Sequence, residues 1–412
     1  MNKVAIVVQR CHESIVGGSE SLAWHYATLL KDVYEVDILT TTAIDIQHWT
    51  NVLPAGIEKR DGVAIHRFPV TIGRTPYWGV LLHKLFRDFD QYSNRNAGNE
   101  KGARRLPWSI ALQEEFIKTQ GPYSEPLLQF LRERWADYHA IIFTTYLYPT
   151  TYFGIFQVPK HTALLAPTLH DEKTAYLSAF KHAAHRARKL VWLTEAERRV
   201  GVKLWGELPG QVVSMSLDTE PREPAQRDRP YLLYCGRIDP NKGCVDLFNH
   251  FIEFKKQHPS NLQLLLTGKD DMPVPSHPDI EFRGFVDHEE KLRLMAGAKI
   301  FVMPSGNESF SIVTLEAMVQ RAPVLASGVS EVLVDHINES GAGGIYNDYE
   351  SFASTLTKML NDEVELTAMG ARGRDYVLSR FTRDQVRESL LQLLTGLQDK
   401  QDLHVNRDFF PR

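Results

Sequence analysis

The stretch Phe301–Met318, FVMPSGNESFSIVTLEAM, decides the fold of the second half of this chain. It starts as an apolar strand, breaks at Pro304–Asn307 and resumes as an apolar helical pattern up to Met318. Turn residues between an apolar run and a helical pattern predict a strand–loop–helix unit. Such a loop directs unpaired backbone N–H groups at one spot, where the helix dipole adds about half a positive charge. Phosphate is the ligand expected there.

Two carboxylates bracket this loop, with Glu308 predicted in the loop and Glu316 inside the helix. Both carboxylates would repel a bound phosphate unless each of them interacts with another group. A carboxylate can bind the hydroxyls of a ribose, as in dinucleotide sites, which suits Glu316. Glu308 would then lie near whatever the nucleotide carries. The alternative is an acid that caps the helix and a second acid that faces solvent.

A basic loop follows the predicted strand Tyr231–Cys235, which opens the second half. The loop runs from Gly236 to Gly243 and carries Arg237 and Lys242. Arginine can bind phosphate oxygens bidentately and lysine adds a mobile point charge, so together they can neutralise a diphosphate. Two basic residues in a loop mean little alone.

The first half opens with a strand–helix–strand pattern at Val4–Val8, Glu20–Leu30 and Val36–Thr40. This pattern predicts a parallel sheet with right-handed crossovers. The first loop contains Gly17 and Gly18, where a backbone can approach a ligand and the helix N-terminus favours an anion. Glycines that merely form a turn are the alternative, since the G-x-G-x-x-G fingerprint is missing.

His170 and Asp171 follow the predicted strand Thr162–Pro167, on the side of a parallel sheet where ligands bind. His170 is either structural or a group that binds a sugar hydroxyl or takes the acceptor's proton. Further along, Thr194 is the expected N-cap of a helix, with Glu197 completing a capping box.

Composition indicates a globular chain of two domains, because 412 residues are too many for one ordinary core. Three cysteines without metal spacing predict reduced thiols in the cytoplasm. We expect no signal peptide, because Asn2-Lys3 runs straight into the first predicted strand. Residues 59–203 hold 22 basic and 13 acidic side chains. This excess suits an anionic acceptor or the inner face of a membrane, to which the protein would bind peripherally. Solvated surface charge explains it equally well.

The spacing of Glu308 and Glu316 resembles the E-x7-E signature of the retaining glycosyltransferases of family 4. The run Ala322–Glu331, APVLASGVSE, and the G-R…K-G spacing of the basic loop are similar to that family as well. The similarity is loose before residue 160 and close over 231–345. It implies an α/β GT-B fold of two Rossmann-like parallel-sheet domains that face each other across a cleft.

The resemblance implies an acceptor-binding domain at 1–213, a nucleotide-sugar-binding domain at 214–383, and a C-terminal helix of about 384–412 that packs back on the first domain. It assigns catalytic roles to Glu308, His170, Arg237 and Lys242, and an acceptor-side role to Asp171. The residues expected to bind the donor are Gly17, Gly18, Gly236, Gly268, Arg283, Phe285, Val286, Ser309, Phe310, Ser311, Ile312, Val313 and Glu316. Ser309 and Ser311 stand where glycine is common in the family, which leaves the sugar open.

By this resemblance the chain is a retaining, metal-independent hexosyltransferase without a cofactor. Its expected partners are a nucleotide-sugar donor, with a glucose-like UDP-sugar favoured, and a glycan or lipid-linked saccharide acceptor in polysaccharide biosynthesis. We expect no nucleic-acid partner. Two alternatives stay open: a nucleotide-sugar epimerase of the same fold, and a non-catalytic sugar-nucleotide-binding subunit of an assembly complex.

Overall fold

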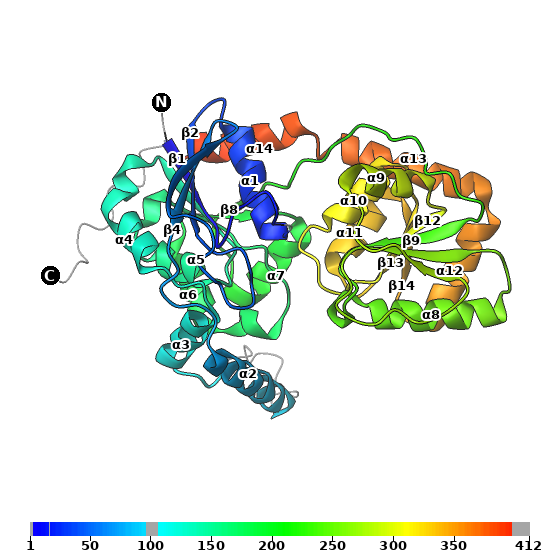
Figure 1. Cartoon of the computed structure of the whole chain (residues 1–412), viewed down its shortest axis with the longest axis horizontal. Coiled ribbons are helices and arrows are strands. Elements are labelled where there is room, and N and C mark those ends of the chain that lie inside the picture. Colours follow the sequence, from blue (N-terminus) through cyan, green and yellow to red (C-terminus); the bar gives the residue numbers. More distant parts are fainter. Residues whose placement is uncertain (1–2, 16, 96–105, 398–412) are drawn as a thin grey trace.

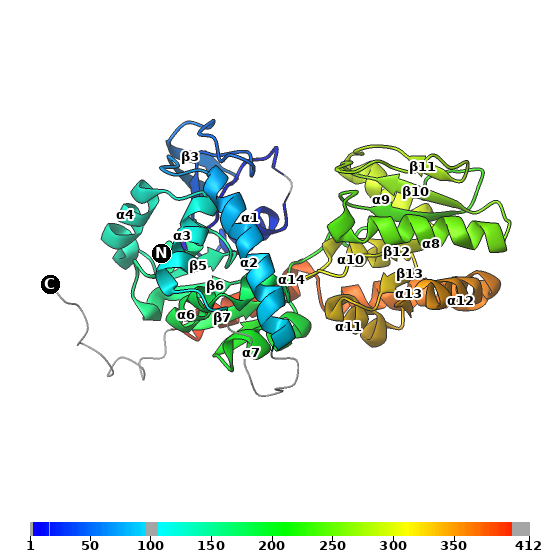
Figure 2. The same ribbon diagram turned by 90° about the horizontal axis from the view of Figure 1, so that it is seen from below.

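A computed structural model describes residues 3–15, 17–95 and 106–397 and shows two α/β lobes side by side (Figure 1). The two lobes are separate in the perpendicular view as well (Figure 2). Each lobe is built on its own sheet, one of eight strands and one of six. The predicted fold class of two Rossmann-like parallel-sheet domains is confirmed.

The first sheet has the strand order β3-β4-β2-β1-β5-β6-β7-β8 and is parallel except for the β3–β4 hairpin. Its strands are β1 (Lys3–Val7), β2 (Glu35–Thr41), β3 (Gly56–Arg60), β4 (Val63–Phe68), β5 (Ala140–Thr144), β6 (Ala163–Ala166), β7 (Lys189–Trp192) and β8 (Gly210–Val212). Its helices are α1 (Gly18–Leu30), α2 (Pro76–Arg95), α3 (Ile110–Gln120), α4 (Glu125–Arg134), α5 (Pro149–Ile155), α6 (Ser178–Arg186) and α7 (Glu195–Trp205).

The first strand shows why this sheet is sandwiched between helices. Val4 and Ile6 pack with α1 on one face, whereas Ala5 and Val7 pack on the other face in the cluster that contains Phe116 of α3. Successive side chains of a strand point to opposite faces, so an unbroken apolar run needs cover on both. The run at Val4–Val7 is fully buried.

The second sheet is parallel throughout, in the order β11-β10-β9-β12-β13-β14. Its strands are β9 (Tyr231–Cys235), β10 (Gln263–Thr267), β11 (Ile280–Phe282), β12 (Ile300–Met303), β13 (Val324–Ser327) and β14 (Gly343–Tyr346). Its helices are α8 (Cys244–Gln257), α9 (His288–Gly297), α10 (Ile312–Val319), α11 (Glu331–Ser340), α12 (Tyr349–Asn361) and α13 (Glu363–Leu378). The strand–loop–helix unit predicted for 301–318 is confirmed as β12 and α10.

Both sheets contain a point where the chain reverses its direction of winding. In the first sheet it lies between β1 and β5, and in the second between β9 and β12. Crevices at the carboxyl ends of such neighbouring strands are where open α/β sheets bind ligands. The loops after β9 and β12 are the basic loop and the loop of Glu308.

The last described helix, α14 (Arg383–Thr395), lies against α1 of the first lobe (Figure 1). The guanidinium of Arg387 donates to the Leu29 carbonyl at 3.2 Å, and that of Arg383 donates to the Thr28 carbonyl at 2.9 Å. The C-terminal segment predicted at about 384–412 extends beyond this helix, and residues 398–412 lie outside the described part of the chain. The domain limits at 213 and 383 stay our proposal.

The two loops at the β9–β12 crevice touch backbone to backbone at Gly243. Its φ of +74° is left-handed, and a Cβ built there would lie 2.3 Å from the Pro304 carbonyl oxygen. A side chain at this position is therefore strained by its conformation and also excluded by its neighbour.

We predict that Gly243→Ala lowers the Tm by clearly more than Gly206→Ala does. Gly206 has a φ of +86° and nothing within 4 Å of its Cβ position, so its substitution costs only the left-handed strain, about 1–2 kcal/mol. Thermal unfolding of the two variants beside the wild type measures the difference. Equal losses would show that the loops have room to move apart.

Candidate functional site

The site is built around an ion pair that joins the loops after β9 and β12. Lys242 Nζ donates to Glu308 Oε1 at 2.8 Å, and the side chains are 30% and 12% exposed. Lys242 ends a 3₁₀ turn, Pro240–Lys242, whose N-cap Asp239 accepts from the Asn241 amide at 2.7 Å. The turn thus fixes where the lysine points, toward the neighbouring strand end.

Arg237 belongs to the same loop but has a different environment. Its guanidinium lies 3.6 Å from Asp239 and is 55% exposed. Its carbonyl accepts from the Tyr234 hydroxyl at 2.6 Å, which anchors the backbone of the loop. The structure therefore brings Lys242, and not Arg237, to Glu308, and leaves the guanidinium at the surface of the loop.

The second carboxylate, Glu316, has a lysine of its own. Lys291 of α9 donates to both carboxylate oxygens, at 2.8 and 2.7 Å. Glu308 and Glu316 are thus each neutralised by a lysine from a different element. Lys291 was not among the predicted residues, because a single lysine within a helix carries no signal of its own.

The loop between β12 and α10 is held from both sides. Ser311 adopts a left-handed conformation with φ of 57°, and its hydroxyl lies 2.9 Å from that of Thr314 in a buried position. The Phe310 carbonyl accepts from His336 Nε2 at 3.0 Å, while His336 Nδ1 accepts from the Tyr376 hydroxyl at 2.9 Å. The Ser311 hydroxyl is therefore engaged inside the loop, and the adjoining amides of Ile312 and Val313 form the N-terminal end of α10.

The other predicted donor residues of the second lobe follow β9, β10 and β11. A Cβ at Gly268 would lie 2.0 Å from the Gly236 carbonyl oxygen, and the Gly268 amide donates to the Gly284 carbonyl at 2.9 Å. Three successive strand ends are thus packed backbone to backbone. Beyond them Phe285 is 74% exposed, Arg283 is exposed and Val286 is half-buried.

A cavity of about 240 Å³ lies between the two lobes beside Glu308. From the first lobe His170, Asp171 and Glu197 line it, and from the second Glu308 and Val329. His170 bonds to the backbone of Glu308. Burial lowers the pKa of His170, although Glu172 and Glu308 oppose the effect. Its Nδ1 is buried and has no hydrogen-bond partner among the residues that the structure describes.

Asp171 and Gly17 each have a local partner in the first lobe. The Asp171 carboxylate accepts from Lys203 at 2.6 Å and from the Tyr176 hydroxyl at 2.7 Å. A Cβ at Gly17 would lie 2.2 Å from a carboxylate oxygen of Glu20, whereas Gly18 has nothing within 4 Å. The absent side chain at Gly17 therefore makes room for Glu20, which accepts from Arg10 at 2.5 Å at the β1–β5 crevice.

Further contacts join the lobes beside the cavity. The Thr194 hydroxyl donates to the Ser309 carbonyl at 3.2 Å. Arg199 of α7 donates to both oxygens of Asp335 on α11, at 3.0 and 2.9 Å. Figure 1 shows α7 and α11 at the facing edges of the two lobes.

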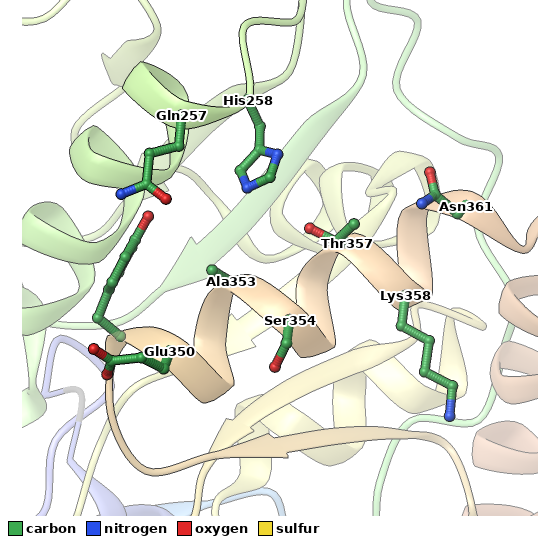
Figure 3. A pocket seen from close by; sticks show the side chains of 9 residues that line it. Gln257, His258, Glu350, Ala353, Ser354, Thr357, Lys358 and Asn361 are labelled. Atoms are coloured by element: carbon green, nitrogen blue, oxygen red, sulfur yellow. The ribbon is translucent and has the colours of Figure 1, made fainter.

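A larger hollow of about 580 Å³ lies elsewhere, between the end of α8 and α12 (Figure 3). All its lining residues come from the second lobe, and none is a predicted site residue. It has neither a strand-end loop nor a lysine–carboxylate pair, so we do not place the site there. Across residues 3–15, 17–95 and 106–397, no three His, Cys, Asp or Glu side chains gather as metal ligands.

Glu197 is the buried carboxylate of this site. Its oxygens accept from the Leu169 and Leu193 amides at 2.7 and 2.5 Å, and its own amide donates to the Thr194 hydroxyl at 3.0 Å. The expected N-cap at Thr194 is thereby confirmed. Burial raises the pKa of Glu197 to about 8 against the effect of these backbone bonds. The carboxylate ties together the two strand ends that carry His170 and Thr194.

Comparisons with known proteins agree with this arrangement. Residues 229–362 match the family model described as "Glycosyl transferases group 1". This part of the chain is similar to the group 1 glycosyltransferases. The resemblance found in the sequence is confirmed, and the matched residues include all four members of the two lysine–carboxylate pairs.

Two curated relatives are glycosyltransferases. A D-inositol 3-phosphate glycosyltransferase of Kineococcus radiotolerans is 29% identical over 45% of this chain and 52% of its own length. An alpha-1,3/1,6-mannosyltransferase alg-2 of Neurospora crassa is 31% identical over 42% of this chain and 38% of its own length. The chain thus spans about half, or less, of these glycosyltransferases.

Among solved structures, Anabaena Alr3699/HepE in complex with UDP and glucose superposes with a TM-score of 0.66, over 96% of this chain and all of that one. At 12% identity this likeness shows the fold alone. No helix in the described part of this chain is long and apolar enough to cross a membrane.

We predict that the stability of Glu197→Gln depends less on pH than that of the wild type. The pKa of Glu197, about 8, lies above its ordinary value of 4.5, so the folded protein holds this proton more tightly than the unfolded chain does. The contribution of the proton is complete below pH 4.5 and is lost as the pH rises through 8. The Tm of the wild type relative to the variant should fall across that window.

Thermal unfolding at several pH values measures this difference. Glu195→Gln is the matched control, because Glu195 lies on the same helix with its side chain 57% exposed. Parallel Tm curves for wild type and Glu197→Gln would contradict the prediction.

Proposed function

We propose that this protein is a retaining glycosyltransferase that moves a hexose from a nucleoside-diphosphate sugar to a glycan or lipid-linked saccharide in polysaccharide biosynthesis. Residues 214–383 would bind the donor and residues 1–213 the acceptor. The observation that carries the proposal is the Lys242–Glu308 pair, placed at the β9–β12 crevice and facing His170 across the cavity.

The diphosphate of the donor would lie between the basic loop and the N-terminus of α10. Lys242 has three N–H donors, of which one reaches Glu308, so others remain for phosphate oxygens. Arg237, exposed in the same loop, adds a second cation. Charge develops on the leaving diphosphate in the transition state, where preorganised cations lower the barrier most. These residues would do the work that a divalent cation does elsewhere.

The sugar would lie in the cavity between the lobes. Glu308 would accept from its hydroxyls, and His170 would bind a hydroxyl from the opposite wall. In the same-face mechanism that the family resemblance implies, the departing phosphate takes the proton of the attacking acceptor. UDP is the favoured nucleotide, because the fold neighbour Alr3699/HepE carries UDP and glucose.

The test is the release of nucleoside diphosphate from a sugar nucleotide in the presence of acceptor saccharides. A thermal-shift screen of sugar nucleotides first selects the donor, since a ligand raises stability by RT ln(1 + [L]/Kd). Lys242→Ala and Glu308→Ala should each lower kcat by about 100-fold or more, as the loss of one preorganised charge contact does.

Lys358→Ala is the matched control, because this lysine lines the larger hollow on the second lobe. It should leave kcat unchanged. Equal turnover in the wild type, Lys242→Ala and Glu308→Ala would show that the site lies elsewhere. Conversion of the donor sugar without acceptor would indicate the epimerase instead.

A further inference from the structure

The pair Lys291–Glu316 is a second charged unit at the donor loops, distinct from Lys242–Glu308. Lys291 comes from α9, which follows the loop of Phe285, and Glu316 comes from the second turn of α10. The ammonium touches both carboxylate oxygens, and the two side chains are only 22% and 11% exposed. A contact to both oxygens fixes the orientation of the carboxylate plane.

The position of this pair ties it to the crevice. Helices α9 and α10 follow the carboxyl ends of β11 and β12, and they pack against each other. Both charges also act on the thiol of Cys235, the last residue of β9. Burial raises the pKa of Cys235 to about 12, with Lys291 lowering and Glu316 raising it. The pair therefore lies at the carboxyl end of β9, where the sheet reverses its winding.

A half-buried ion pair is a poor source of stability, because the loss of hydration offsets most of the attraction. A bound nucleotide would give this pair a role other than stability. An unpaired Glu316 would repel a diphosphate at the N-terminus of its own helix. A carboxylate also has about four acceptor positions, and Lys291 takes one on each oxygen. Two positions remain, one for each hydroxyl of a ribose.

We propose that Lys291 is a positioning residue for ribose recognition. It holds the Glu316 carboxylate in the orientation that receives the 2′ and 3′ hydroxyls, and it cancels the charge that would otherwise oppose the diphosphate. This inference rests on the proposed function, since it assumes a nucleoside-diphosphate donor. It adds a residue that selects ribonucleotides, whatever base and sugar the donor carries.

The test is nucleotide binding to the full chain by calorimetry, which needs no acceptor. The probes are whichever of UDP, GDP and ADP binds the wild type best, its 2′-deoxy form, and the nucleoside without phosphates. Wild type should prefer the ribonucleotide about tenfold, because one hydrogen bond to a charged group is at stake. In Lys291→Met this preference should disappear, and affinity should fall more for the diphosphate than for the nucleoside.

Two further variants separate this role from a merely structural one. Lys291→Met combined with Glu316→Gln removes both charges, so it should bind the diphosphate better than Lys291→Met alone. Lys291→Arg keeps the charge and should retain most of the affinity. Arg293→Met is the control, because Arg293 lies on the same helix and its guanidinium is 4.0 Å from Glu290. It should bind as the wild type does.

The outcomes are distinct. If the wild type binds none of the nucleoside diphosphates, the proposed function fails and this inference fails with it. If the wild type binds one and Lys291→Met keeps both the affinity and the preference for the ribose hydroxyl, only the role of Lys291 is overturned. If the double variant binds more weakly than Lys291→Met, the pair is structural.

Discussion

The contact between Lys242 and Glu308 depends on the order of strands in the second sheet. Residues 66 positions apart meet because β9 and β12 are neighbours, although β10 and β11 come between them in the chain. The reversal of winding leaves the two strand ends without a helix crossing between them, so their loops meet over the crevice. Gly243 lets the loops approach to backbone contact, which a Cβ would prevent. The position of the charges is thus a property of the topology.

The first lobe forms the other wall of the cavity between the lobes, and a buried carboxylate holds that wall in place. Its strand ends after β6 and β7 are joined by the Glu197 carboxylate, which accepts from the Leu169 and Leu193 amides. A fully buried acid is costly unless it is well bonded, and here the bonds are backbone amides that cannot swing away. The Glu197 carboxylate therefore holds the backbone of the segment that carries His170. The His170 ring bonds to the backbone of Glu308 in the other lobe.

The two loops of the candidate site that meet at the β9–β12 crevice could be predicted from the sequence because their signals are local. Glycine positions, a strand end and a helix start all lie within a few residues of Lys242 and of Glu308. Lys291 could not be predicted, because its contact with Glu316 spans 25 residues and depends on how α9 packs on α10. Glu197 was predicted only as a capping residue, since its bond to the Leu169 amide comes from a different strand end.

Ser311, in the loop between β12 and α10, departs from the family pattern. The family resemblance places Ser311 where glycine is common, which leaves the sugar open. The structure gives the serine the left-handed conformation that glycine would adopt and turns its hydroxyl to Thr314. A non-glycine residue in this conformation costs about 1–2 kcal/mol, which the buried hydroxyl pair helps to offset. Because that hydroxyl is engaged, our proposal leaves discrimination between sugars to groups that line the cavity, Glu308 and His170.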